Sequence, residues 1–108
     1  MQDCVFCKII KKELSSDIVY ESEKVLAFKD IYPRSPIHFL IVPKKHIESI
    51  ISKDSERIVG DLILAAKEIA KEREITGFKL IFNVGKAGGQ IVDHLHLHFL
   101  AGQVSQIP

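Results

Sequence analysis

The segment from Asp93 to Phe99, "DHLHLHF", holds three of the chain's five histidines. These histidines alternate with Leu95, Leu97 and Phe99. Successive side chains of an extended strand point to opposite faces, so the histidines would share one face and the apolar residues the other. A helix would mix the two kinds of residue around its surface. The stretch therefore predicts a strand with an apolar core face and an imidazole face.

The spacing of the three histidines is compatible with two kinds of chemistry. Neighbouring imidazoles on one face of a strand lie about 6 to 7 Å apart. Such a row can ligate a metal ion or act on a phosphate group. From the spacing alone, both possibilities remain open.

The composition predicts one compact domain spanning residues 1–108, with 46% hydrophobic and 27% charged residues. The 15 basic and 14 acidic side chains give a net charge of +1, so we expect neither nucleic acid nor a membrane surface as a partner. Lysines interrupt the N-terminal apolar run, and no apolar stretch of 18 residues occurs. We therefore expect a cytoplasmic protein, with its two cysteines reduced.

Hydrophobic periodicity predicts an α+β domain: an antiparallel sheet of about five strands with one long helix and a short N-terminal helix. Apolar residues recur at helical spacing between residues 54 and 72, which predicts the long helix. The short helix is expected within residues 4–14. Strands are expected at residues 17–21, 24–30, 37–43, 78–84 and 91–100.

Three segments resemble one known family. "HLHLHFL", from His94 to Leu100, is similar to the histidine triad (HIT) motif, in which three histidines alternate with apolar residues. "AFKDIYPRSPIHFLIVPKKHI" resembles the nucleoside-site segment of that superfamily, and "NVGKAGGQ" resembles its phosphate loop. The resemblance extends from "CVFCKII" to Leu100, and the length is similar to that of the nucleoside phosphoramidase (Hint-like) branch. It implies a HIT-like fold, a homodimer and a purine nucleotide substrate.

The resemblance also implies catalytic roles for three histidines. His96 would attack the α-phosphate of a purine nucleoside phosphoramidate and form a covalent nucleotidyl-histidine. An imidazole with an ordinary pKa of about 6.5 is largely neutral at pH 7, so it can attack directly. His98 would donate a proton to the departing amine. We expect His38 to orient the His96 ring.

The substrate would be held by a polar set and an apolar set of residues. Consecutive glycines let backbone N–H groups approach an anion closely, so the phosphate is expected near the glycine-rich loop. By resemblance, Asp30 would bind the ribose hydroxyls. The phosphate contacts are predicted to be Asn83, Gly88, Gly89, Gln90 and His98, and the apolar base slot to be Phe6, Ile9, Phe28, Ile31 and Leu40.

The Cys4-x-x-Cys7 pair supplies half of a tetrahedral zinc site. Similar bacterial proteins complete such a site with the histidine of "PKKH", here His46, and with the first triad histidine, here His94. We therefore expect a structural zinc ion and no cofactor for catalysis. The alternative is a pair of reduced, unligated cysteines.

Two other functions stay open at this point. The chain could be a low-turnover purine nucleotide-binding regulator, or a metal-dependent enzyme that uses the histidine triad as ligands. No acidic residue follows Asp93, which argues against a cupin-like metal site. Ile91 stands where the phosphoramidase branch generally has serine, and the C-terminal tail is short and lacks tryptophan. These departures bear on turnover and on the preferred leaving group.

Overall fold

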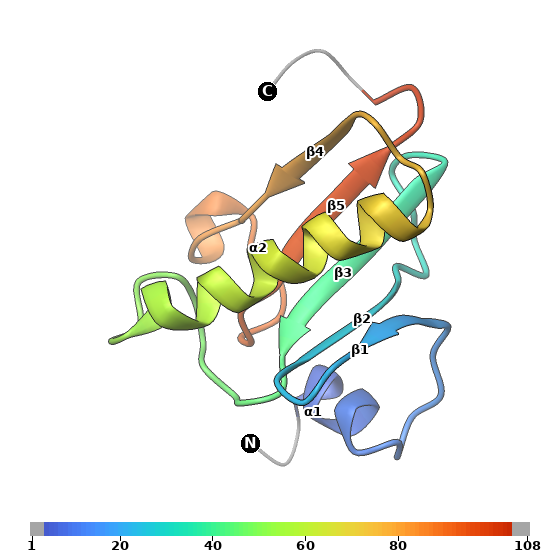
Figure 1. Cartoon of the computed structure of the whole chain (residues 1–108). Coiled ribbons are helices and arrows are strands. Elements are labelled where there is room, and N and C mark those ends of the chain that lie inside the picture. Colours follow the sequence, from blue (N-terminus) through green and yellow to red (C-terminus); the bar gives the residue numbers. More distant parts are fainter. Residues whose placement is uncertain (1–3, 105–108) are drawn as a thin grey trace.

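The structure, a computed structural model, describes residues 4–104. Within this range five strands form one antiparallel sheet in the order β1-β2-β3-β5-β4 (Figure 1). With one long and one short helix, this confirms the predicted α+β architecture. In chain order the elements are α1 (Val5–Ile10), β1 (Ile18–Glu21), β2 (Val25–Lys29), β3 (Ile37–Pro43), α2 (Ser55–Glu72), β4 (Phe78–Ile81), the 3-10 turn η1 (Lys86–Gly88) and β5 (Leu97–Ala101).

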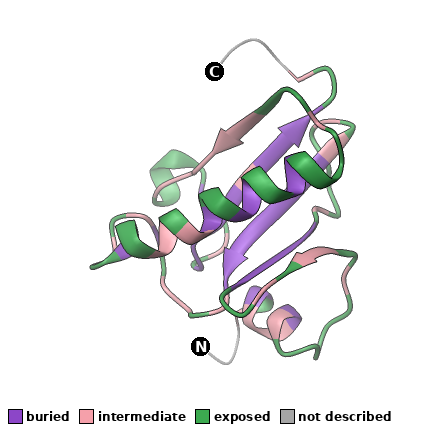
Figure 2. Cartoon of the chain, viewed as in Figure 1, coloured by how far each residue is buried: buried purple, intermediate pink, exposed green. Residues whose placement is uncertain are grey.

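The central strands bury side chains on both faces of the sheet, against different partners. The α2 helix crosses one face and covers the main core, while the short α1 helix lies by the β1–β2 end of the sheet (Figure 1). Figure 2 shows the central strands as the most buried part of the fold. Alternate residues of each central strand therefore join different clusters. The α2 side receives Phe39, Ile41, Leu97 and Phe99, and the α1 side receives Leu26, Phe28, Leu40 and Val42.

The histidine stretch is strand only in part, which corrects the predicted strand at residues 91–100. The β5 strand begins at Leu97, so His98 lies in the ladder while His94 and His96 precede it. Continuing the register of the ladder would pair Pro43 with Leu95, but both have other partners. The Pro43 carbonyl lies 2.9 Å from His94 Nε2, and the Leu95 N–H donates to the carbonyl of Ile47. The period of two nevertheless continues, since Leu95 still packs in the α2-side core.

Two other elements are shorter than predicted. The N-terminal helix has six residues, because Lys12 adopts a left-handed backbone (φ 66°) and the Glu13 N–H donates to the carbonyl of Lys8. This hydrogen bond closes a Schellman-type turn that ends the helix. The β4 strand ends at Ile81, so Phe82 and Asn83 belong to the following loop.

The β1 and β4 strands form the two edges of the sheet. The predicted homodimer and the predicted single domain over residues 1–108 stay predictions. Among the residues described, none of the helices combines the length and the apolar character that crossing a bilayer requires.

Phe99 offers a direct test of the core. Its side chain is fully buried and stacks between Phe39 and Phe78, with ring centroids 5.7 and 4.6 Å away. We expect Phe99→Ala to lower the free energy of unfolding by about 3 to 5 kcal/mol, because the ring leaves a cavity. Urea titration followed by circular dichroism measures the change. Ile51→Ala is the control, since Ile51 is 79% exposed and its loss should change stability by less than about 0.5 kcal/mol. Equal losses in the two variants would contradict this account of the core.

Candidate active site

His96 is held by a main-chain group in one defined orientation. Its Nδ1 lies 2.8 Å from the carbonyl oxygen of His94, which can only accept, so Nδ1 carries the proton and Nε2 keeps a lone pair. Every buried side-chain nitrogen or oxygen among the described residues has a hydrogen-bond partner. His96 Nε2 has no protein partner there, so this atom is open to solvent. Burial lowers the pKa of His96, which keeps the ring neutral.

The apolar wall next to His96 comes from α1, β2 and β3. The Phe6 ring meets the His96 ring edge to face at a centroid distance of 5.1 Å, and it also meets Phe28 at 5.6 Å. Ile9 and Leu40 complete this cluster, so four of the five predicted slot residues pack together. Ile31 does not join them, because it lies on the loop after β2 and is 79% exposed.

His38 contacts His98 and not His96, which corrects the predicted pairing. His38 Nε2 lies 3.0 Å from His98 Nδ1 and 3.4 Å from Asp30 Oδ2. The reason is the strand register: His38 pairs with Leu100, so His98 is its diagonal neighbour on the same face of the sheet. The pKa of His98 is lowered to about 4, first by burial and then by the nearby His96 and His38. Burial also lowers the pKa of His38, against the opposing effect of Asp30.

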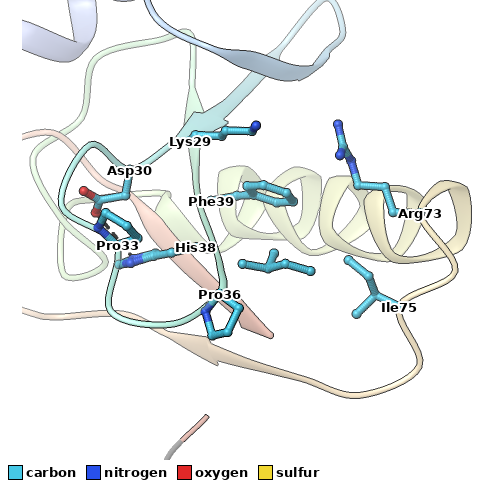
Figure 3. Close-up of a pocket in the computed structure, with 9 residues that line it drawn as sticks. Lys29, Asp30, Pro33, Pro36, His38, Phe39, Arg73 and Ile75 are labelled. Atoms are coloured by element: carbon cyan, nitrogen blue, oxygen red, sulfur yellow. Dashed lines mark ion pairs between the residues drawn. The ribbon is translucent and has the colours of Figure 1, made fainter. Parts of the chain in front are cut away.

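A cavity of about 400 Å³ lies at the end of the sheet next to these residues. Figure 3 shows Asp30 and His38 on one side of it, joined by their ion-pair contact, with Lys29 and Arg73 on the other. The Arg73 guanidinium lies over the Phe39 ring at 5.1 Å. The cavity therefore reaches Asp30 and His38 from the α2 side of the sheet.

The glycine-rich loop uses its predicted phosphate donors internally. The N–H groups of Gly88 and Gln90 donate to the carbonyl of Gly85, and the N–H of Gly89 donates to that of Lys86. Gly89 has a left-handed backbone (φ 93°), which favours glycine. In this structure the loop is thus a closed turn, and the three predicted donors bind its own carbonyls.

Two polar side chains also hold this loop in place. Asn83 Nδ2 donates to the carbonyl of Gly88. The buried Gln90 side chain accepts from the Gly85 N–H at 2.9 Å and donates to the carbonyls of Glu48 and Val92. Their amide groups therefore position the loop beside the histidine segment.

The four predicted metal ligands converge. Cys4 Sγ and Cys7 Sγ lie 3.3 and 3.7 Å from His94 Nδ1, and Cys7 Sγ lies 3.3 Å from His46 Nδ1. Zinc bonds of about 2.3 Å to sulfur and about 2.0 Å to nitrogen, at tetrahedral angles, would place sulfur and nitrogen about 3.5 Å apart. The Pro43 carbonyl accepts from His94 Nε2–H, which leaves the Nδ1 lone pair toward the thiols. These four side chains form a possible Cys2His2 metal site.

Asp30, His38 and His98 form a second cluster close enough to hold a metal ion. Here the hydrogen bonds argue against ligation. His38 Nδ1 accepts from the main-chain N–H of Arg34 at 3.0 Å, so the proton of the neutral ring lies on Nε2, the atom that faces the cluster. A metal ion at Nε2 would have to displace that proton toward another donor.

The main-chain groups that set these rings could not be found from side-chain motifs. The N–H groups of Tyr32 and Arg34 bind Asp30 Oδ1 and His38 Nδ1, and the carbonyls of Pro43 and His94 bind two triad rings. Only the "IYPRSP" segment hinted at them, because its two prolines indicate an irregular, stiff loop.

Comparison with known proteins identifies the family. The profile described as "Scavenger mRNA decapping enzyme C-term binding" matches residues 3–106. The chain is 42% identical over 105 residues to an uncharacterized HIT-like protein of Synechococcus elongatus, covering 94% of this chain and 92% of that protein. It is also 42% identical over 107 residues to protein HitA of Neisseria gonorrhoeae, covering 96% of this chain and all of that protein.

Solved structures indicate the same family. A histidine triad protein from Clostridium difficile superposes with a TM-score of 0.94 at 45% identity, covering 100% of this chain and 97% of that one. A HIT family hydrolase from Clostridium thermocellum gives 0.90 at 47% identity, covering 100% and 96%. The chain belongs to the histidine triad family.

The lowered pKa of His98 predicts a pH effect on stability. The unfolded ring has a pKa near 6.5 and the folded ring about 4, so between these values the unfolded state binds more protons. This contribution to stability is complete above about pH 6.5 and is lost as the pH falls toward 4. We expect His98→Asn to show a smaller loss of unfolding free energy than wild type between pH 7.5 and 4.5, measured by urea titration. Parallel pH profiles for the two proteins would count against a buried neutral His98.

Proposed function

We propose that the protein is a hydrolase that cleaves purine nucleoside 5′-phosphoramidates at the α-phosphate through a covalent nucleotidyl-His96 intermediate. The observation that carries the proposal is the state of His96. Its Nδ1 proton is held by the His94 carbonyl, and its Nε2 lone pair is open to solvent. Two similar structures are named HIT family hydrolases, which supports the hydrolase class.

The proposed reaction takes two displacements at phosphorus. In the first, His96 Nε2 forms a bond to the α-phosphorus and the bond from phosphorus to the amine breaks. The departing amine takes a proton from His98 Nε2. In the second, water attacks the phosphorus, the bond to His96 breaks, and the proton of the water returns to His98. The pKa of His98 is about 4 in the free protein, so the ring is neutral at pH 7. It therefore offers the departing amine its single proton, which the water of the second step restores.

The nucleoside would lie between Asp30 and the apolar cluster of α1. The Asp30 carboxylate is partly accessible and is oriented by the Tyr32 N–H, so it can still accept from ribose hydroxyls. Phe6 lies against His96, so a purine resting near Phe6 would place its α-phosphate next to the nucleophile. Ile31, exposed on the neighbouring loop, is free to cover the other side of the base.

The two rival functions receive less support. Among the described residues, His94 groups with the cysteines and His98 with Asp30, while His96 belongs to neither possible metal cluster. The triad therefore does not converge on one ion. A regulator without turnover would need no open lone pair on a buried, neutral imidazole, whereas His96 has one.

His96→Ala tests the nucleophile. We expect kcat on adenosine 5′-phosphoramidate to fall at least about 10³-fold, because the variant cannot form the covalent intermediate. Rapid acid quench followed by mass spectrometry should detect a nucleotidyl adduct on His96 in the wild type only. Ile51→Ala, at an exposed position far in sequence from the three triad histidines, is the control and should keep both activity and adduct. Full activity without an adduct would reject the covalent route.

We further propose that Cys4, Cys7, His46 and His94 bind a structural zinc ion. The ion would join α1 to the histidine segment, since these contacts tie the N-cap residue Cys4 and the helical Cys7 to His94 and His46. The nucleophile lies two residues after His94, yet its lone pair is not part of this cluster. Zinc would therefore support the fold without taking part in phosphorus chemistry.

Metal analysis separates structural zinc from catalytic zinc. We expect purified wild type to contain equimolar zinc and His46→Ala to contain little, with a lower melting temperature because α1 loses its anchor. The exposed neighbour variant Lys45→Ala should retain the metal. EDTA treatment should lower the melting temperature but leave most of the phosphoramidase activity at 20 to 25 °C. Activity that vanishes with the metal and returns with it would favour a metalloenzyme.

A further inference from the structure

Two ring nitrogens of the triad, His96 Nε2 and His98 Nε2, have no partner among the described residues. Since no buried side-chain nitrogen there is unsatisfied, both are open to solvent. Each can be a lone pair or an N–H, and this depends on what holds the other nitrogen of the same ring. The two rings lie close together, with centroids 5.1 Å apart. Their difference in chemistry must therefore come from their Nδ1 partners.

The partners differ in kind. His96 Nδ1 faces the His94 carbonyl, an acceptor, so Nε2 is a lone pair. His98 Nδ1 faces His38 Nε2 at 3.0 Å, which is another imidazole and could either donate or accept. The state of His98 is therefore undetermined until the state of His38 is known.

A main-chain group determines the state of His38. The Arg34 N–H can only donate, and it donates to His38 Nδ1 at 3.0 Å. The single proton of neutral His38 must then lie on Nε2. The carboxylate of Asp30, 3.4 Å from that nitrogen, also favours a proton there. His38 Nε2–H thus donates to His98 Nδ1, and the proton of His98 lies on Nε2.

We propose that the main-chain N–H of Arg34 fixes the tautomers of His38 and His98 in series, so that His98 presents an N–H to the substrate while His96 presents a lone pair. The catalytic meaning of this arrangement rests on the proposed phosphoramidase function. The tautomers themselves are a property of the free protein. Arg34 is thereby a positioning residue that acts through its backbone, not through its guanidinium.

The loop between β2 and β3 supplies two of the main-chain donors that orient these side chains. Pro33 and Pro36 restrict its backbone, and two of its N–H groups point inward: Tyr32 to Asp30 Oδ1 at 2.8 Å and Arg34 to His38. Both prolines line the cavity at the end of the sheet (Figure 3). One loop therefore orients the proposed ribose acceptor and the proposed proton donor together.

His96 and His98 therefore have different chemical roles, although their side chains are identical. A lone pair on His98 Nε2 would repel the electron-rich phosphoryl oxygens. It would also compete with the His96 lone pair for phosphorus. An N–H there instead binds a phosphoryl oxygen or the amine nitrogen. The direction of the hydrogen bonds from Arg34 thus decides which ring attacks and which donates.

Nitrogen-15 NMR of histidine-labelled wild type at pH 7.5, without substrate, tests the inference directly. Long-range proton–nitrogen spectra report the tautomer of each ring, and single substitutions assign the five histidines. We expect Nε2–H for His38 and His98 and Nδ1–H for His96. A Nδ1–H or doubly protonated His38, or a Nδ1–H His98, overturns the proposal. Because no substrate is present, this result is independent of whether the proposed function is correct.

Two substitutions at one position isolate the backbone group. Arg34→Pro removes the N–H, while Arg34→Ala keeps it and removes only the side chain. We expect the alanine variant to retain the wild-type tautomers. The proline variant should show loss of the Nε2–H state of His98 and a fall in kcat of about tenfold or more, as for loss of a positioned proton donor. Unchanged tautomers in a folded Arg34→Pro overturn the proposal.

His38→Phe tests the second link and covers the case in which Arg34→Pro does not fold. The substitution fills the buried site but removes both ring nitrogens, so His98 Nδ1 loses its donor. We expect His98 to show a mixture of tautomers, while His96, held by the His94 carbonyl, stays Nδ1–H. A His98 that keeps its pure Nε2–H state in this variant shows that His38 does not set it, and the proposal fails.

Discussion

The antiparallel pairing of β3 with β5 positions His38 and His98 in the candidate site. The register joins His38 to Leu100 and Leu40 to His98. It places Phe39, Ile41, Leu97 and Phe99 on the α2 side and both histidines on the opposite side. A shift of one residue would bury the histidines against α2 and expose the aromatic stack, so the apolar face enforces the register of the polar one. The core thereby fixes the geometry of the site.

Where this ladder stops is equally important. Before Leu97 the chain does not pair with β3. There the rings of His94 and His96 hydrogen-bond to main-chain carbonyls. Each triad histidine consequently meets a different environment. His94 faces two thiols, His96 faces solvent with its lone pair, and His98 faces another imidazole. A uniform strand would have given them more similar surroundings.

Backbone groups also decide what each ring can do chemically. A carbonyl leaves the opposite nitrogen as a lone pair, as at His94 and His96, and an N–H leaves it as a donor, as at His38. This explains why one side-chain type can act as metal ligand, nucleophile and proton donor within a few residues. The same logic separates the Cys2His2 cluster, whose His94 lone pair faces the thiols, from the Asp30 cluster, whose His38 proton faces inward.

Local patterns in the sequence were sufficient to predict the period of two at residues 94–99 and the helical period of α2, because both follow from backbone geometry and the apolar pattern. The polar residues near the histidines were predicted from the resemblance to the histidine triad family. The same resemblance indicated that Cys4, Cys7, His46 and His94 belong together, and the structure brings these four side chains within contact. Three features are seen only in the folded chain: His38 contacts His98, Ile31 lies apart from Phe6, and Gly88 and Gly89 donate to their own loop. Strand register joins residues distant in the sequence, and main-chain hydrogen bonds depend on the backbone conformation of each loop; no side-chain pattern records either.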